Sequence, residues 1–419
     1  MNVLHVIAGM DPKMGGVCQA VRTIAAGLAE LGVHNEVVSL DAADASFLAD
    51  DPLQIHALGP GKGPWGYSPK LIPWFYANFS RFDCVIAHGL WLYQTHATEK
   101  ALRLFRKQQP ADESVPRFYV MPHGMLDPYF QRAEGRKLKA LRNWAYWKLI
   151  EGRVINNADG VLFTCEAERL LAREPFHPYH PKRDVVVGLG VEEPPAYSPR
   201  MEEAFLERCP ELKGKPYILF LSRIHEKKGV DLLIDAYITT EEKQAKADAK
   251  VSVSAIPTLS TTTPLPTAGP SHLVVAGPGL ETSYGQKMKE LASGSNETRT
   301  SITFPGMLTG LAKWGAFYHC EAFVLPSHQE NFGIAVVEAL ACNKPVLISN
   351  QVNIWREIQE GGGGIIADDT LGGTQKLLEQ WGQLSTEQKL SMGQQARACF
   401  VRNFATGPAA SRLLNAIAK

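Results

Sequence analysis

The stretch that decides the fold is SHQENFGIAVVEALACNKPVLIS, residues 327–349. An apolar, strand-like run at 322–325 precedes it, and a second run at 345–348 closes it. Between them, apolar residues lie on several sides of one short predicted helix, 332–342, as expected of a helix packed on a parallel sheet. The stretch therefore predicts a strand–helix–strand unit of an α/β protein.

Two glutamates in this stretch are eight residues apart. Glu330 falls just before the predicted helix, and Glu338 lies about one turn into it. The backbone N–H groups of Asn331, Phe332 and Gly333 then sit at the positive helix end, which suits an anionic or polyhydroxyl ligand. Gly333 also permits close approach of that ligand to the backbone. Taken singly, either glutamate is better interpreted as a cap or a solvated carboxylate.

A basic loop, SRIHEKKG at 222–229, follows the predicted strand 216–221 and precedes a helix predicted over 230–237. Arg223 can form paired hydrogen bonds to phosphate oxygens, and Lys228 adds a compact positive charge. Without a second motif, the plain interpretation is a solvated basic loop.

Together the two motifs resemble those of the retaining nucleotide-sugar glycosyltransferases of family four, also called group 1. That family carries Glu, Asn-Phe-Gly and a second Glu eight residues after the first, and a Gly-Arg-x4-Lys-Gly segment in which Ser222 here replaces the glycine. The resemblance spans nearly the whole chain and is specific in 222–229 and 327–349. It implies the α/β GT-B fold, with two Rossmann-like, doubly wound domains facing a central cleft.

The length of 419 residues fits two domains. We expect an acceptor-binding N-terminal domain, 1–190, to which a closing helix, 401–419, crosses back. We expect the donor-binding domain at 191–400, after a linker rich in Pro and Gly. A Ser-, Thr-, Pro- and Ala-rich segment at about 240–271 reads as an exposed, flexible insertion.

Composition narrows the functional classes. The formal net charge is zero, so nothing indicates nucleic-acid binding, and 45% hydrophobic with 21% charged residues is typical of a soluble globular protein. The seven scattered cysteines lack a CxxC pair, which favours a reduced cytoplasm and argues against a zinc site. No apolar run approaches the roughly 20 residues of a membrane span, and none at the N-terminus suits a signal peptide. We expect a cytoplasmic protein, or one peripheral on the inner face of the plasma membrane.

The N-terminal half supplies further candidates. Its first loop, GMDPKMGG at 9–16, matches neither the GxGxxG motif nor the P-loop motif. This argues against a dehydrogenase or an NTPase. Predicted strands end at His88 and His123, where parallel sheets bind ligands, although each histidine could simply cap its loop. The resemblance places His123 beside the donor sugar and leaving phosphate, and Gly16 near the donor phosphate. His88 and Trp91 are weaker acceptor-site candidates.

Residues 132–156 predict a basic, aromatic, amphipathic helix. Such a helix can lie on an anionic membrane, or its apolar face can pack on the domain. The second interpretation is favoured, and peripheral membrane contact stays an alternative.

The resemblance also implies the chemistry. Arg223, Lys228 and the helix end after Glu330 would stabilise the leaving UDP. No Asp-x-Asp motif occupies a plausible donor loop, so we predict no metal and no cofactor beyond the UDP-sugar donor. Glu338 would bind ribose, Glu330 the transferred sugar, and backbone groups near Met307 the base.

The acceptor is expected to be a saccharide or a lipid-linked hydroxyl in cell-surface polysaccharide synthesis, with glucose or a similar hexose transferred. Two alternatives stay open. A UDP-sugar epimerase would share the GT-B fold, although the paired motifs fit transfer better, and the other alternative is a non-catalytic UDP-binding module. The module would need only the C-terminal half and would bind UDP without turnover on any acceptor.

Overall fold

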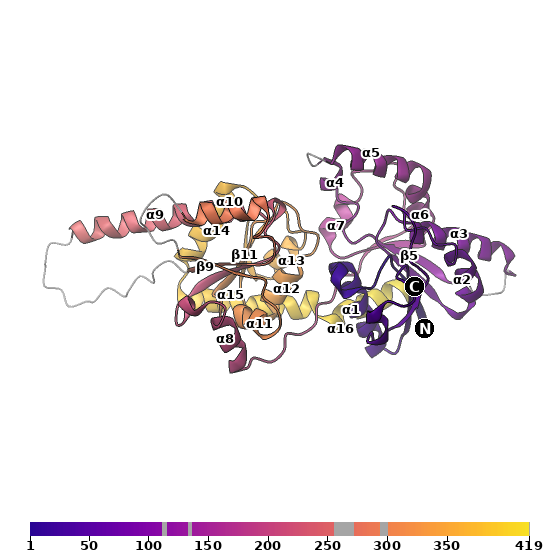
Figure 1. The fold of residues 1–419 in the computed structure, drawn as a ribbon, viewed down its shortest axis with the longest axis horizontal. Helices are drawn as coiled ribbons and strands as arrows, with labels where there is room; N and C mark the ends of the chain where they lie inside the picture. Colours follow the sequence, from indigo (N-terminus) through magenta and orange to yellow (C-terminus); the bar gives the residue numbers. More distant parts are fainter. Residues whose placement is uncertain (111–114, 133–135, 255–271, 294–300, 419) are drawn as a thin grey trace. The chain divides into compact units, whose positions relative to one another are not determined.

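A computed structural model describes residues 1–110, 115–132, 136–254, 272–293 and 301–418. The chain divides into two compact units. Unit 1 comprises residues 1–192 and 403–419, and unit 2 comprises residues 193–402. Each is a parallel sheet with helices on both faces (Figure 1).

Unit 1 has a seven-stranded parallel sheet in the order β3-β2-β1-β4-β5-β6-β7. The chain moves outward in one direction from β1 to β3 and in the other from β4 to β7, so the order reverses between β1 and β4. Ligands of open α/β sheets bind outside the carboxyl ends of the strands at such a reversal. The strands are β1 (Asn2–Val6), β2 (His34–Ser39), β3 (Gln54–Ala57), β4 (Cys84–His88), β5 (Arg117–Met121), β6 (Gly160–Phe163) and β7 (Asp184–Val186).

The helices of unit 1 cover both faces of this sheet. Helices α2 and α3 pack on one face, over a core that includes Phe75, Phe105 and Phe118. On the other face α1 packs against the C-terminal α16 (Figure 1). The hydroxyl of Tyr119 contacts the carbonyl of Ala416 there, which ties β5 to α16. The helices are α1 (Gly16–Glu30), α2 (Leu71–Asn78), α3 (Tyr93–Gln108), α4 (Tyr129–Arg132), α5 (Lys137–Tyr146), α6 (Gly152–Asn157), α7 (Glu166–Leu171) and α16 (Thr406–Ala418).

Unit 2 has a six-stranded parallel sheet in the order β10-β9-β8-β11-β12-β13, and its order reverses between β8 and β11. The fold class expected from the sequence, two doubly wound Rossmann-like sheets, is confirmed. The strands are β8 (Tyr217–Leu221), β9 (His272–Ala276), β10 (Ile302–Gly306), β11 (Ala322–Leu325), β12 (Val346–Ser349) and β13 (Gly364–Ala367). The helices are α8 (Pro199–Leu206), α9 (Val230–Ser254), α10 (Ser283–Ser293), α11 (Gly310–His319), α12 (Ile334–Ala341), α13 (Trp355–Glu360), α14 (Leu371–Gln383) and α15 (Thr386–Cys399).

The predicted insertion is partly wrong. The helix expected to end at 237 continues as α9 to Ser254, projecting beyond the neighbouring α10 (Figure 1). The charged run 241–250 is rich in Glu, Lys, Gln and Ala, which are strong helix formers, and this accounts for the continuation. The rest of the predicted insertion, 255–271, lies outside the described residues.

The single helix expected over 132–156 is also wrong. The chain forms α5, then a π-helical turn from Trp147 to Glu151, and then α6. A π-turn inserts one extra residue into the helix and changes which side chains face the core. Residues 133–135 lie outside the described part of the chain. Within that part, no helix is long and apolar enough to cross a membrane.

Candidate active site

In unit 2, the predicted basic loop and the predicted glutamate loop meet at the strand-order reversal. Lys228 follows β8 and Glu330 follows β11, and the Nζ of Lys228 forms an ion pair with the carboxylate of Glu330. The Lys228 side chain is 7% exposed and that of Glu330 is 22% exposed. A shielded ion pair of this kind produces a strong local electric field. It lies at the carboxyl ends of the strands, where parallel sheets bind ligands.

Gly229 makes this meeting of loops possible. Its φ is 63°, in the left-handed region, and a Cβ there would lie 2.2 Å from the carbonyl oxygen of Pro326. Only glycine fits so close an approach of the two loops. The sequence K-G therefore fixes where Lys228 stands relative to the loop after β11.

Glu338 has a partner that the sequence did not indicate. Lys313, on α11, donates to Glu338 on α12 at 2.6 Å, and its Nζ lies 4.7 Å from the centre of the Trp314 ring. Burial raises the pKa of Glu338 and the charge of Lys313 opposes that rise. Lys313 and Glu338 are 25 residues apart in sequence and lie on two different helices. No short sequence motif could therefore predict their contact.

The helix at the glutamate loop begins later than predicted. α12 starts at Ile334, two residues after the expected start, and Gly333 is its N-cap with φ 76°. Val336 and Val337 already donate to the carbonyl of Gly333, so the remaining first-turn donors are the N–H groups of Ile334 and Ala335, two half-buried residues. Asn331 and Phe332 belong to the loop before the helix, and Phe332 is buried.

The other donor-site candidates of unit 2 lie after β8 and after β10, two strands that are separated by β9 in the sheet. Arg223 is exposed in the loop after β8 and forms no ion pair with any described residue. Met307 directly follows β10 and is 60% exposed. Both are accessible to a ligand at the carboxyl edge of the sheet.

In unit 1, the structure brings His88 and His123 together. The Nδ1 of His88 and the Nε2 of His123 are 3.0 Å apart, at the ends of adjacent strands β4 and β5. Burial, together with the neighbouring histidines, lowers the pKa of His88 well below its ordinary value. Burial lowers the pKa of His123 to about 4. Both imidazoles are therefore neutral near pH 7.

The loops after these strands adopt unusual backbone conformations. Trp91 has φ 73° and His123 has φ 53°, values that cost energy for residues other than glycine and that cluster at functional sites. Glu168, which the sequence did not single out, stabilises the second loop, since its buried carboxylate accepts from the N–H of Gly124 at 2.5 Å. Gly16 is the exposed first residue of α1, while the positive φ of that turn falls on Gly15.

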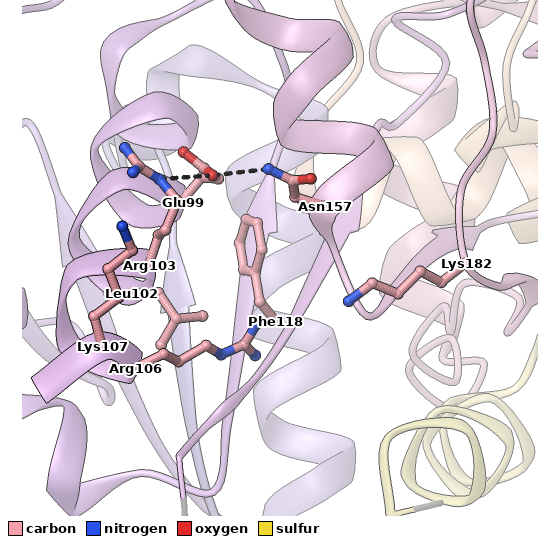
Figure 2. Close-up of a pocket in the computed structure, with 8 residues that line it drawn as sticks. All are labelled: Glu99, Leu102, Arg103, Arg106, Lys107, Phe118, Asn157 and Lys182. Carbon is pink, nitrogen blue, oxygen red and sulfur yellow. Dashed lines mark hydrogen bonds and ion pairs between the residues drawn. The ribbon is translucent and has the colours of Figure 1, made fainter. Parts of the chain in front are cut away.

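A cavity of about 370 Å³ in unit 1 contains none of the predicted site residues. Figure 2 shows five of its lining side chains on one helix, α3. Phe118, at the beginning of β5, places the cavity toward the edge where strands start, opposite to His88 and His123. The lining residues are Glu99, Leu102, Arg103, Arg106, Lys107, Phe118, Asn157 and Lys182.

Two family descriptions match consecutive parts of the chain. Residues 15–190 match the family "Glycosyl transferase 4-like domain", and residues 202–398 match "Glycosyl transferases group 1". The chain is a group 1 glycosyltransferase of family four. It has the GT-B fold of that family.

One curated relative and two solved structures resemble this glycosyltransferase over very different shares of their lengths. A mannosylfructose-phosphate synthase of Agrobacterium fabrum is 25% identical over 154 residues, which cover 36% of this chain and 29% of the relative, well under half of its length. Anabaena HepE, solved with UDP and glucose, is 16% identical with a TM-score of 0.67, covering 100% of this chain and 99% of HepE. The lipopolysaccharide outer core galactosyltransferase WaaB is 14% identical with a TM-score of 0.64, covering 100% and 99%.

Sequence reasoning missed two further groups in the glycosyltransferase. His5 lies in the first buried strand, fully buried, with its Nδ1 3.0 Å from the Nε2 of His88. A histidine inside an otherwise apolar strand was a visible signal. Glu151 is fully buried in the π-turn, and burial raises its pKa to about 8. Its partners, Thr95 and the N–H of Trp91, could not be read from the sequence.

Proposed function

We propose that this glycosyltransferase is a retaining, metal-independent hexosyltransferase that moves glucose or a similar hexose from a UDP-sugar to a hydroxyl of a saccharide or lipid-linked acceptor in cell-surface polysaccharide synthesis. The contact of Lys228 with Glu330 at the strand-order reversal of unit 2 carries the proposal. It joins a cation suited to a diphosphate with a carboxylate suited to sugar hydroxyls. The ligands in HepE and the named activity of WaaB support the same class of donor and product.

The reaction breaks the bond between the anomeric carbon and the β-phosphate oxygen and forms a bond from that carbon to the acceptor oxygen. The acceptor attacks from the face that UDP leaves, with no covalent glycosyl-enzyme, and its proton passes to the departing phosphate. Negative charge grows on UDP as it leaves. Arg223, Lys228 and the first-turn N–H groups of α12 are the chain's means of stabilising that charge.

Each carboxylate has a separate proposed role. Glu338, held by Lys313, accepts hydrogen bonds from the ribose hydroxyls, and Glu330 accepts them from the transferred sugar. Backbone groups near Met307 pair with the base. His123 acts on the reacting sugar. Because Lys228 is paired with Glu330, a diphosphate that binds Lys228 must share or displace that partner.

The test measures two numbers for each variant: the UDP Kd by calorimetry and the turnover of UDP-glucose with an oligosaccharide acceptor. Glu338→Gln should weaken UDP and UDP-glucose alike, since ribose belongs to both. Glu330→Gln should leave the UDP Kd within a few-fold while turnover falls. Equal loss of UDP binding in the two variants would show that the order of the glutamates along the donor is misassigned.

The predicted absence of a metal is tested directly. Turnover of UDP-glucose in excess EDTA should equal that in buffer, because protein cations carry the leaving-group charge. Activity lost in EDTA and restored by Mg²⁺ or Mn²⁺ would reject this part of the proposal.

We also propose that unit 1 contacts the membrane that carries a lipid-linked acceptor. α5 and the π-turn expose four large apolar side chains to solvent: Leu138, 84% exposed; Leu141, 62%; Trp144, 52%; and Leu149, 79%. The opposite side of the same segment is buried through Asn143, Tyr146 and Trp147. Packing on the domain is thus satisfied, and a second apolar face stays in water. Exposed apolar surface of this kind marks an interaction site.

The positive charge around the exposed apolar side chains of α5 and the π-turn indicates an anionic partner. Exposed cations flank the apolar residues, and 136–150 contains no Asp or Glu. Lys137 and Lys139 form no ion pair with any described residue. A helix with exposed Leu and Trp beside Lys and Arg fits the interface of an anionic lipid bilayer. The exposed cations are Lys137, Lys139, Arg142 and Lys148.

Vesicle co-sedimentation tests this surface. The full chain should sediment with phosphatidylglycerol-containing vesicles at low salt and much less with pure phosphatidylcholine. Leu138→Gln/Leu141→Gln should reduce binding about tenfold or more, since each buried leucine contributes about 1.5–3 kcal/mol. Leu390→Gln, at a residue 66% exposed in unit 2, is the matched control and should bind as the wild type does. Equal recovery with both vesicle types would contradict the proposal.

A further inference from the structure

Three histidines and one asparagine form a continuous line of hydrogen-bonding contacts across the sheet of unit 1. Asn35 Oδ1 lies 3.1 Å from His5 Nε2, His5 Nδ1 lies 3.0 Å from His88 Nε2, and His88 Nδ1 lies 3.0 Å from His123 Nε2. They belong to four adjacent strands or the loops that follow them, β2, β1, β4 and β5. His5 and His88 are essentially inaccessible to solvent, and His123 is half-buried.

The strand register explains the line. His5 pairs with Ile86, two residues before His88, and His88 pairs with Met121, two residues before His123. Because side chains alternate between faces, residues two apart lie on the same face. Each contact therefore moves one strand across the sheet and two residues toward its carboxyl edge. The line begins inside unit 1 and ends at the edge where ligands bind.

Asn35 sets the direction of the hydrogen bonds. Its Nδ2 donates to the backbone carbonyls of Ala25, at 3.2 Å, and Val33, at 2.9 Å. These two acceptors fix the amide orientation, so Oδ1 must be the atom that faces His5. An amide oxygen can only accept. His5 therefore donates from Nε2.

The position of the proton on His5 determines the position of the proton on each following histidine. A neutral imidazole has one donor and one acceptor nitrogen. Since Nε2 of His5 carries its proton, Nδ1 of His5 accepts from Nε2 of His88, and Nδ1 of His88 accepts from Nε2 of His123. Burial lowers the pKa of His5 and of His123 to about 4, so the neutral forms prevail near pH 7. The second nitrogen of His123, Nδ1, is left with a lone pair and has no partner among the described residues.

We propose that Asn35, His5 and His88 are positioning residues that hold His123 in the Nε2–H tautomer and present its Nδ1 to the reacting centre as a hydrogen-bond acceptor. The ligand of that nitrogen rests on the proposed function. A lone pair binds a sugar hydroxyl, which can donate, and repels a phosphate oxygen, which cannot. The line thus assigns His123 to the sugar and leaves the diphosphate to the cations of unit 2.

A merely structural role makes different predictions. If the histidines only filled space, an apolar side chain of similar size at position 5 would serve. If they transmit the tautomer, position 5 must accept from His88 and donate to Asn35. Glutamine can do both through its amide, and leucine can do neither. His5→Gln and His5→Leu are therefore a matched pair.

The first experiment uses the full chain without substrate. Long-range ¹H–¹⁵N spectra of ¹⁵N-histidine-labelled protein at pH 7.5, assigned by single substitutions, report which ring nitrogen carries the proton. Nε2 should be protonated and Nδ1 bare in His5, His88 and His123. His56, whose Nε2 lies 2.6 Å from the Glu36 carboxylate, is an internal reference for a protonated Nε2. A proton on Nδ1 of His123, or an imidazolium there, would overturn the proposal.

The second experiment compares variants. In His5→Gln the tautomer of His123 and the turnover of UDP-glucose should stay close to the wild type. In His5→Leu both tautomers of His88 and His123 should appear, and turnover should fall about tenfold, the effect of one lost hydrogen bond, with the UDP Kd unchanged. His56→Gln should leave the line as it is. Equal turnover and equal spectra for His5→Gln and His5→Leu would contradict the proposal and show that the histidines only pack together.

The two hypotheses fail separately. The tautomers are measured without ligand, so the expected spectra with no turnover of UDP-glucose would reject the proposed donor and retain the line. Turnover of UDP-glucose with Nδ1–H on His123 would retain the glycosyl transfer and reject the line. If His5→Leu does not fold, the wild-type spectrum alone still decides the tautomer.

Discussion

The strand-order reversals of the two units hold opposite kinds of polar cluster. In unit 1 the cluster is a row of neutral histidines joined end to end from β1 across β4 to the loop after β5, of which His5 and His88 are buried and His123 is half-buried. In unit 2, between β8 and β11, it is the ion pair of Lys228 with Glu330, with a second pair, Lys313 with Glu338, on nearby helices. The same topology therefore supplies a place for a ligand twice, and the side chains decide which chemistry occurs there.

The difference has an energetic basis. A buried charge is tolerated only with a partner, so removing one member of a pair leaves the other exposed to the full desolvation cost. Neutral imidazoles avoid that cost as long as they do not take up a second proton. The stability of unit 2 should therefore fall when one charge of an ion pair is removed. The stability of unit 1 should fall when the pH is lowered.

The largest effect is expected where an ion pair is broken in unit 2. Lys228→Met should lower the free energy of unfolding of unit 2 by about 2–3 kcal/mol, because Glu330 keeps a charge without its partner in a mostly shielded site. Urea unfolding followed by fluorescence measures the change. Lys228→Met/Glu330→Gln should recover most of the loss. The matched control is Lys289→Met, at an exposed lysine on α10, which should change stability by less than about 0.5 kcal/mol. A double variant as unstable as the single one would argue against a coupled pair.

A smaller change in stability is expected when acid protonates the histidine line of unit 1. The folded pKa of His5 is lowered to about 4 from an unfolded value of 6.5, so unfolding takes up a proton between these values. Its contribution to stability is present above pH 6.5 and is lost as pH falls toward 4. Between pH 6.5 and 5, His5→Gln should therefore lose less stability than the wild type, by at most about 1.4 kcal/mol per pH unit.

Thermal or urea unfolding at several pH values measures this difference in slope. His180→Gln, at a histidine outside the line, is the control and should follow the wild type. Parallel wild-type and His5→Gln curves would contradict a neutral, buried His5.

At Glu151 the sign of the pH dependence reverses. Burial raises the folded pKa of Glu151 to about 8 from 4.5, so its contribution is present below pH 4.5 and is lost as pH rises through 8. Glu151→Gln keeps the neutral shape and should change stability little at pH 5. From pH 5 to 8 the variant should lose less stability than the wild type does. A wild-type curve no steeper than that of the variant would show that Glu151 is ionised in the folded protein.

The sequence predicted the fold through features that are local. Strand–loop–helix alternation and the motifs at 222–229 and 327–349 indicated two doubly wound sheets, because period and turn chemistry are written in neighbouring residues. The same local logic placed Lys228 and Glu330 at strand ends. It failed for α9, where strong helix formers carried the helix past the predicted end.

The partners of the site residues could not be predicted, because they depend on register and on distant contacts. Lys313 reaches Glu338 from another helix, and Glu168 reaches the loop of His123 from α7. His5 becomes part of a line only through the pairing of β1 with β4. A residue type can be read from the sequence, whereas its hydrogen-bond partner is a property of the packed sheet.

The most direct test of the account is the UDP Kd of three variants measured by calorimetry on the full chain. We propose that the diphosphate binds the cations of unit 2 and that the sugar contacts the neutral histidine line of unit 1. Arg223→Ala and Lys228→Ala should each weaken UDP about tenfold to a hundredfold, the cost of a charge-assisted hydrogen bond. His123→Ala should leave the UDP Kd unchanged while UDP-glucose turnover falls. Unchanged UDP affinity in both cation variants, or a large loss in His123→Ala, would contradict it.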